Sequence, residues 1–161
     1  VSACCMFAEL AAWAADRGMS IYQLLQQVFV EYGLYKDQGV SVVRKGKSGA
    51  EEIEAMMKNF RENPLKTLAG SPVVEVLDYA KLQGLWLDKG EVFTLDMPTT
   101  SNVLQYKTAD GTKVSIRPSG TEPKIKFYIG VRGKVTSKED LPAAEAACLE
   151  KIQVIRQELG I

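Results

Sequence analysis

Two strand-like runs joined by an Asp-Gly turn restrict the fold of this chain more than any other feature. Residues 103–108 and 113–117 are rich in strand-forming residues, and Asp110-Gly111 lies between them. An Asp-Gly pair flanked by such runs is the strongest short-range signal for a β-hairpin. A third run of this kind, residues 125–131, follows a short loop. The sequence therefore predicts antiparallel strands in the second half of the chain.

Two amphipathic helices are expected beside these strands. Ser48 and Glu51 have the spacing of a capping box before an apolar helix face, and Asn63-Pro64 ends that segment. The final helix is expected to start near Asp140, with an apolar stripe made by Leu141, Ala144, Cys148, Ile152, Ile155 and Leu159. Residues 40–44 and 73–82 are also β-rich, whereas residues 84–98 show little periodicity. The expected fold is α+β, a small antiparallel sheet with two helices packed on one face.

The first 36 residues predict a helical pair that precedes this sheet. Residues 1–17 are rich in alanine, with few polar positions, and Gly18 ends them. A capping box at Ser20 and Gln23 opens a second helix, which Gly33 closes. We expect residues 1–36 to be the helical tail of a preceding domain and residues 37–161 to form the C-terminal domain. A hinge is expected near residues 34–39, in a short link that contains Gly33 and Gly39. The chain has no initiator methionine, so it is expected to be a piece of a longer protein.

The charge balance and the missing histidine exclude several classes of function. The 161 residues contain 20 Lys and Arg against 20 Asp and Glu, and no His. A net charge of zero argues against nucleic acid or a membrane surface as partner, since both need a basic excess. Without histidine, this chain alone cannot build a Ser–His or Cys–His catalytic pair or a histidine-ligated metal site.

The three cysteines, Cys4, Cys5 and Cys148, predict no special chemistry. An odd number without CxxC spacing fits reduced core residues of a cytosolic protein better than a disulfide framework or a zinc site. No apolar run approaches the roughly 20 residues that a membrane span needs. A cytoplasmic location is therefore expected.

Residues 117–126 have the composition of an anion-binding loop. The segment Ser119-Gly120-Thr121 lies between two prolines at the end of a predicted strand. Glycine lets the backbone approach a ligand and tolerates a positive φ, so that successive N–H groups can converge on an anion. The two hydroxyl groups add further donors.

Basic residues flank the loop on both sides. Arg117 offers a planar fork that matches phosphate oxygens, and Lys124 and Lys126 share one face of the next strand because side chains alternate along a strand. Glu122 is interpreted as a charge partner of these lysines rather than as a catalytic acid. The spacing is not that of a P-loop. From composition alone, an ordinary hairpin loop with a solvated basic edge is the alternative, because Ser, Gly and Thr are common in turns.

At these residues a family resemblance becomes specific. Residues 117–128, RPSGTEPKIKFY, closely resemble the phosphate-binding loop of the C-terminal domain of α-D-phosphohexomutases, the phosphoglucomutase/phosphomannomutase family. Residues 98–106, the Asp110-Gly111 hairpin and the final helix follow that domain in order. Residues 1–36 resemble the closing helices of the family's third domain, including the pair Tyr32-Gly33. The continuation KIKFY is similar to the phosphoglucomutase and phosphopentomutase branch.

The resemblance implies a substrate, partners and cofactors. The family interconverts sugar 1-phosphates and 6-phosphates (or 5-phosphates) through a bisphosphate intermediate, and its last domain holds the substrate phosphate. Carried over to this chain, the matching phosphate-binding residues are Arg117, Ser119, Gly120, Thr121 and Lys126, with Glu122 and Lys124 in support. Lys126 stands where many members have arginine, so it keeps the charge and loses the bidentate fork. The implied partners are the sugar phosphate and the preceding domains of the same polypeptide.

The family's chemical groups are missing from these 161 residues. The sequence has no serine in the phosphoserine context, no DGD-type magnesium loop and no GEXSGH-type sugar-recognition loop. We therefore expect no catalytic residue and no metal site in this chain, and no activity of the chain alone. Mg²⁺ and a sugar bisphosphate activator are implied for the full-length enzyme. The sugar stays open among glucose, mannose, glucosamine and pentose phosphates.

Two other interpretations are kept. The chain could be a stand-alone, non-catalytic anion-binding or regulatory module, which a native start at Val1 would favour. It could also be a purely structural domain whose loop only turns the chain. Backbone amide shifts in residues 117–126 on addition of phosphate separate this last interpretation from the other two.

Overall fold

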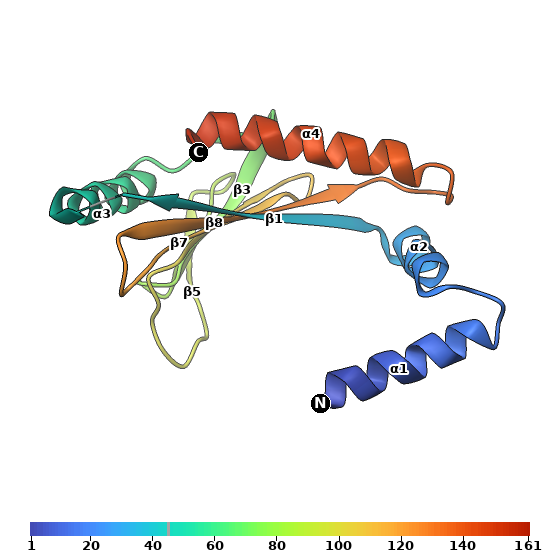
Figure 1. Cartoon of the computed structure of the whole chain (residues 1–161). Helices are drawn as coiled ribbons and strands as arrows, with labels where there is room; N and C mark the ends of the chain where they lie inside the picture. The colour runs from blue at the N-terminus through green and yellow to red at the C-terminus, as the bar shows by residue number, and fades with distance from the viewer. Residues whose placement is uncertain (45) are drawn as a thin grey trace.

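The computed structural model describes residues 1–44 and 46–161 (Figure 1). Its elements in chain order are α1 (Ser2–Ala15), α2 (Ile21–Tyr32), β1 (Leu34–Val43), α3 (Gly46–Glu62), β2 (Thr67–Leu68), β3 (Ser71–Asp78), β4 (Gln83–Trp86), β5 (Glu91–Thr94), β6 (Leu104–Thr108), β7 (Lys113–Pro118), β8 (Lys124–Gly133) and α4 (Leu141–Leu159).

One antiparallel sheet organises the chain. The strand order is β1-β8-β7-β6-β3-β4-β5, and the short β2 pairs with β3 beside this path. The hairpin predicted at Asp110-Gly111 is confirmed as β6 and β7, which pair from Leu104↔Ile116 to Lys107↔Lys113. Gly111 has a φ of +85°, a conformation that disfavours residues with a Cβ. The Asp-Gly signal therefore identified this hairpin correctly.

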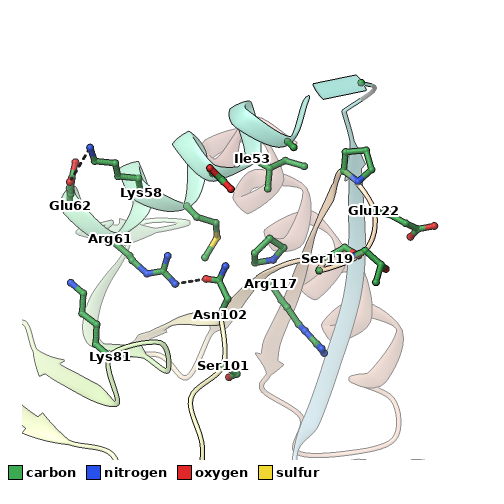
Figure 2. A pocket seen from close by; sticks show the side chains of 18 residues that line it. Ile53, Lys58, Arg61, Glu62, Lys81, Ser101, Asn102, Arg117, Ser119 and Glu122 are labelled. Carbon is green, nitrogen blue, oxygen red and sulfur yellow. Dashed lines mark hydrogen bonds and ion pairs between the residues drawn. The ribbon is translucent and has the colours of Figure 1, made fainter. Parts of the chain in front are cut away.

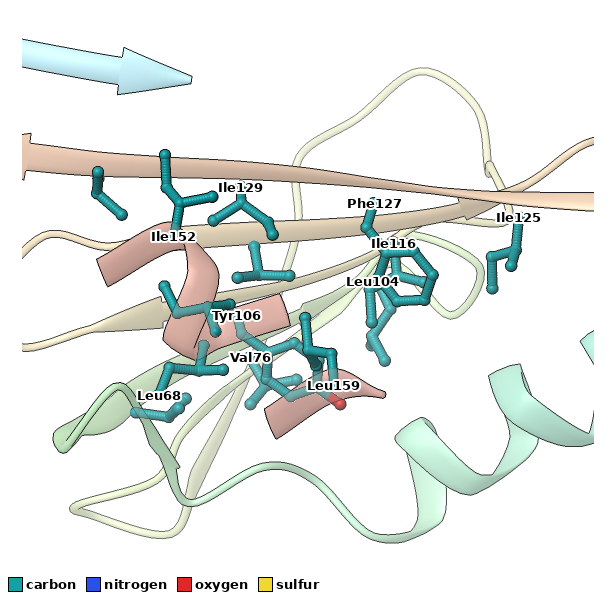
Figure 3. Close-up of a cluster of buried hydrophobic side chains, with 14 of the residues drawn as sticks. Leu68, Val76, Leu104, Tyr106, Ile116, Ile125, Phe127, Ile129, Ile152 and Leu159 are labelled. Atoms are coloured by element: carbon teal, nitrogen blue, oxygen red, sulfur yellow. The ribbon is translucent and has the colours of Figure 1, made fainter. Parts of the chain in front are cut away.

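The two helices α3 and α4 pack against one face of this sheet. Side chains from both helices belong to the same core cluster as the central strands, and α4 lies along the sheet in Figure 1. The predicted stripe of α4 is confirmed, because Leu141, Cys148, Ile152, Ile155 and Leu159 are all buried. Figure 3 shows part of this core, in which Tyr106, Phe127, Ile116 and Ile129 are completely buried. The α+β architecture with helices on one face is thus confirmed.

The sheet is larger than the sequence predicted. Residues 84–98 were interpreted as a loop, yet they contribute to the hairpin of β4 and β5. Each strand has only four residues, too short to show alternation, and Gly84 interrupts the apolar pattern. The hairpin is held by stacking of Trp86 on Phe93, whose ring centroids lie 5.1 Å apart. A Cβ on Gly84 would lie 2.2 Å from Cζ of Phe93, so the ring covers the glycine.

The start of α3 also differs from the prediction. The helix begins at Gly46, so Ser48 lies inside its first turn and is not the cap that the capping-box spacing suggested. Gly49 packs closely against the backbone of Arg44, because a Cβ there would lie 2.5 Å from the carbonyl oxygen of Arg44. The predicted end is confirmed, since the helix stops at Glu62, just before Asn63-Pro64.

The helical pair lies beside one end of the sheet, and none of its residues belongs to the buried core cluster. The capping box of α2 is confirmed, with hydrogen bonds from the Gln23 amide to Ser20 Oγ and from the Ser20 amide to Gln23 Oε1. Cys4 and Cys5 are exposed, so their interpretation as core residues is wrong for this structure, whereas Cys148 is buried. Burial raises the pKa of the Cys148 thiol. No helix in the described part of the chain is long and apolar enough to cross a membrane.

Residues 34–39 belong to strand β1. The strand begins at Leu34, directly after Gly33, and pairs with β8 along its whole length from Leu34↔Gly133 to Val43↔Lys124. The boundary placed between residues 36 and 37 therefore falls inside a strand. Residues 34–39 are held by the sheet, so of the link in which the hinge is expected only Gly33 lies outside the paired strand.

Candidate functional site

The loop of residues 119–123 joins β7 to β8 and is held by main-chain hydrogen bonds. The Ser119 amide donates to the carbonyl oxygen of Lys124 at 2.8 Å, and the Lys124 amide donates to that of Glu122 at 2.7 Å. The Arg44 amide, at the end of β1, donates to the carbonyl oxygen of Pro123 at 2.9 Å. The loop is therefore fixed at both ends and tied to the neighbouring strand.

Arg117 and Lys126 lie next to each other on the face of the sheet opposite the helices. They are direct partners in the β7–β8 register. Burial alternates along both strands, so that Ile116, Ile125 and Phe127 point into the core while Arg117 and Lys126 point away from it. The predicted sharing of one face by Lys124 and Lys126 follows from the same alternation.

A hollow of about 370 Å³ gathers every residue that the sequence selected. It is lined by Arg117, Pro118, Ser119, Gly120, Thr121, Glu122, Lys124, Lys126 and Tyr128. The predicted phosphate-binding residues and both supporting residues thus surround one space. We call this space the outer hollow.

The charged side chains of the outer hollow differ in whether they already have an ion-pair partner. Lys124 forms an ion pair with Glu122. Its hydrogen bond and charge hold the pKa of the Glu122 carboxyl below its usual range, with a smaller contribution from Lys126. In the described part of the chain, neither Arg117 nor Lys126 takes part in an ion pair. These two cations are therefore the ones available to an anion, and Glu122 is the charge partner that the sequence suggested.

The backbone of the loop differs from the prediction in one respect. Gly120 does not have a positive φ, so its conformation does not require glycine. A Cβ at this position would meet nothing within 4 Å. Among the described residues, the amides of Gly120 and Glu122 have no acceptor, and the Thr121 amide has only a long bond of 3.5 Å to Ser119 Oγ. The loop thus presents free N–H groups beside two free cations.

A second, larger hollow of about 920 Å³ is lined by residues of α3 and also by residues 117–123, so that the loop borders both hollows (Figure 2). Its wall includes Arg61, whose Nε donates to Asp78 Oδ2 at 3.1 Å and whose Nη2 donates to Asn102 Oδ1 at 2.6 Å. Sequence reasoning did not select Arg61 or Asn102. No periodic signal could have found them, because they are 41 positions apart and meet only in the folded chain.

The donor set of the outer hollow suits a phosphate dianion. Two cations, two hydroxyl groups and free amides converge there, and charge-assisted hydrogen bonds to phosphate are stronger than neutral ones. A metal site would need a group of acidic or thiol side chains instead. Among the described residues, no three Cys, Asp or Glu side chains lie together. The described residues therefore do not fit a magnesium site.

The fold is an α+β domain whose β7–β8 loop brings cationic and hydroxyl side chains together, and comparison with known proteins shows the family to which such a domain belongs. The family model described as "Phosphoglucomutase/phosphomannomutase, C-terminal domain" matches residues 39–147. Phosphoglucomutase of Staphylococcus haemolyticus (strain JCSC1435) is 32% identical over 116 residues, which cover 72% of this chain and 21% of the relative. Phosphoglucomutase of Staphylococcus aureus (strain MRSA252) is 34% identical over 115 residues, which cover 71% of this chain and 20% of the relative.

The chain belongs to the phosphoglucomutase/phosphomannomutase family, and the matched region is the C-terminal domain of that family. It spans about a fifth of the length of the curated relatives it matches. Among solved structures, the phosphoglucomutase-like pp63/parafusin of Paramecium, in its open form, aligns with a TM-score of 0.41 and 16% identity over 88% of this chain and 24% of that one.

Proposed function

We propose that the loop of residues 117–123, together with Lys126, binds the phosphate group of a phosphosugar in a mutase reaction. The observation that supports this most directly is the register pair of Arg117 and Lys126 beside free loop amides. A phosphate monoester carries up to two negative charges, and two adjacent cations without other partners match that charge. Lys124 and Glu122 stabilise the loop through their own ion pair.

For the whole enzyme we propose interconversion of a sugar 1-phosphate with a 6-phosphate or 5-phosphate through a bisphosphate intermediate. Membership of the family supports this reaction class, and the two staphylococcal relatives are named phosphoglucomutases. The resemblance of residues 117–128 to the phosphoglucomutase and phosphopentomutase branch supports the same choice. Mg²⁺, a bisphosphate activator and the preceding domains of the polypeptide belong to this proposal, as does the cytoplasmic location expected from the cysteines.

This chain's contribution is to bind and orient the substrate. Holding a substrate in a fixed position lowers the entropic part of a reaction barrier. Phosphoryl transfer additionally needs an in-line nucleophile and groups that neutralise developing charge. The one carboxylate lining the outer hollow, Glu122, is held in an ion pair. We therefore propose that the chain alone binds phosphosugars without transferring the phosphoryl group.

Calorimetric titration of glucose 1-phosphate into the 161-residue chain tests the proposal. Arg117→Ala removes a charge-assisted contact worth roughly 1.5–3 kcal/mol, so affinity is expected to fall about 10- to 150-fold. Lys113→Ala is the matched control, because Lys113 is an exposed cation on the same strand that does not line the hollow. Circular dichroism confirms that each variant is folded. Equal affinities of Arg117→Ala and the unaltered chain would refute the assignment.

A further inference from the structure

Tyr128 lines the outer hollow, and the proposed binding of a phosphate by Arg117 and Lys126 assigns no role to it. It follows Lys126 by two positions on β8, so the two side chains share the outer face of the sheet. Tyr128 lines the same hollow as Arg117 and Lys126. Its side chain is large and apolar over most of its surface, yet the residue is 45% exposed.

The sheet leaves the Tyr128 ring uncrowded on both sides. Its register partner on β7 is Ser115, and its partner on β1 is Gly39. Serine is small and glycine has no side chain; a Cβ placed on Gly39 would be 4.0 Å from Cδ1 of Tyr128. No neighbouring strand therefore covers the ring with a large side chain, and its faces are accessible from the hollow.

Two other tyrosines of the chain, Tyr106 and Tyr35, have structural roles that their contacts within the chain explain. Tyr106 is completely buried, and its hydroxyl donates to the carbonyl oxygen of Phe60 at 2.6 Å. Tyr35 lies under the guanidinium of Arg132, 5.7 Å from the ring centroid. Among the described residues, the Tyr128 hydroxyl makes no hydrogen bond and its ring makes no cation–π or aromatic contact. Packing within the chain does not account for it.

The spacing relates the ring to the phosphate-binding cations. Residues two apart on a strand are separated by about 6.6 Å. A ligand whose phosphate contacts Arg117 and Lys126 therefore has its carbon skeleton within reach of the next row of the sheet, where Tyr128 stands. Small-molecule sites commonly combine a few charged groups with an aromatic surface in this way.

We propose that Tyr128 packs against the ring of the molecule whose phosphate the loop holds, and that it makes the site prefer cyclic phosphosugars to free phosphate. This inference rests on the proposed function and goes beyond it, because it assigns a specificity-determining contact to a residue outside the phosphate loop. A sugar ring presents C–H groups on its faces, and the open faces of Tyr128 offer them an apolar surface. Arg117 and Lys126 supply charge to any phosphate, whereas the Tyr128 contact is available only to a phosphate that carries a ring.

Two probes separate the ring contact from the phosphate contact. Glucose 6-phosphate and inorganic phosphate are titrated by calorimetry into the 161-residue chain and into Tyr128→Leu, Tyr128→Phe and Tyr35→Leu. In Tyr128→Leu, affinity for glucose 6-phosphate is expected to fall about three- to tenfold, the range that aromatic packing supplies. Affinity for inorganic phosphate is expected to stay unchanged. Tyr128→Phe keeps the aromatic ring and should bind both probes like the unaltered chain, as should Tyr35→Leu.

The outcomes distinguish failure of this inference from failure of the proposed function. Equal loss for both probes in Tyr128→Leu, or no loss for either, overturns the role of the ring while phosphate binding stands. A loss in Tyr128→Phe as large as in Tyr128→Leu also overturns it, because the ring is retained there. If the unaltered chain binds neither probe, or if Arg117→Ala binds inorganic phosphate unchanged, the proposed function fails and the inference fails with it.

Discussion

Replacing Asp110 by alanine should destabilise the fold through one turn and one helix contact. Asp110 Oδ1 accepts hydrogen bonds from Thr108 Oγ1 at 2.6 Å, from Thr112 Oγ1 at 2.9 Å and from the Thr112 amide at 3.2 Å. Its other oxygen pairs with Lys151 on α4. The carboxylate thus joins the β6–β7 turn to the helix that covers the sheet.

The expected cost follows from what loses its partner. Thr108 and Thr112 are 4% and 0% exposed, so water cannot replace the lost acceptor easily. The Thr112 amide keeps a bond of 3.0 Å to Thr108 Oγ1, but the Thr112 hydroxyl is left unpaired. A buried unpaired polar group costs about 1–3 kcal/mol, and a partly exposed ion pair adds about 0.2–1 kcal/mol. We expect the free energy of unfolding to fall by about 2.5 kcal/mol.

Urea unfolding at pH 7, followed by circular dichroism, measures this change. Asp110→Asn is the graded variant, because it keeps an acceptor oxygen and loses the ion pair, so it should cost less than Asp110→Ala. Lys134→Ala, at an exposed position just after β8, is a control for loss of a surface charge. A decrease below about 0.5 kcal/mol in Asp110→Ala, the usual range of surface substitutions, would refute the reasoning.

The same contact predicts a pH dependence. Burial opposes ionisation of Asp110 most strongly of the single influences, but hydrogen bonds from Lys151, Thr108 and Thr112 together outweigh it and hold the pKa below the ordinary value. A carboxyl with a lowered folded-state pKa stabilises the fold above its unfolded value, about 3.9. That stability is lost as the pH falls from about 5 toward the folded-state pKa. The difference between the unaltered chain and Asp110→Asn should therefore shrink below pH 4, and a constant difference would contradict it.

Three further predictions test the site and the sheet. Gly120→Ala should leave the thermal midpoint unchanged or slightly higher, because the φ of Gly120 is not positive and a Cβ there meets nothing within 4 Å. The same variant should bind phosphate more weakly in calorimetry. A lowered thermal midpoint would contradict the expectation for stability. Lys126→Ala should weaken phosphate binding more than Lys124→Ala, since Lys124 is already paired with Glu122, and the reverse order in the same titration would be inconsistent with that pairing. Tyr106→Phe should lower the free energy of urea unfolding by about 1 kcal/mol through loss of the bond to Phe60, and an unchanged value would show that this bond contributes nothing.

The features that could be predicted are those encoded by residues close together in sequence. The Asp110-Gly111 turn and the stripe of α4 each depend on spacings within a segment, and the structure places both as expected. The residues selected in segment 117–126 are also close in sequence, and the structure brings them around one hollow. The β4–β5 hairpin escaped prediction because its strands are short and Trp86 and Phe93 stabilise it across the turn.

Other features depend on contacts that no local pattern contains. Arg61 reaches Asn102 only because α3 packs beside the loop that precedes β6. The accessible faces of Tyr128 follow from the identity of its partners on two other strands, Ser115 and Gly39, and hence from the sheet order. The exposure of Cys4 and Cys5 likewise depends on what packs against α1, which its apolar composition does not specify.

Strand β1 is paired with β8 along its whole length, so it is a rigid element between α2 and the loop of residues 119–123. The strand starts at the end of α2 and ends at Val43, and the amide of the next residue, Arg44, donates to the carbonyl oxygen of Pro123 in the loop of residues 119–123. Its ten residues span about 33 Å and are paired throughout with β8. A rotation between the helical pair and the sheet therefore has its pivot at Gly33, where φ is +97°, and not along the strand. Because the loop lies at the far end of this arm, a tilt of about 10° at the pivot would carry it through about 6 Å, with its own geometry intact.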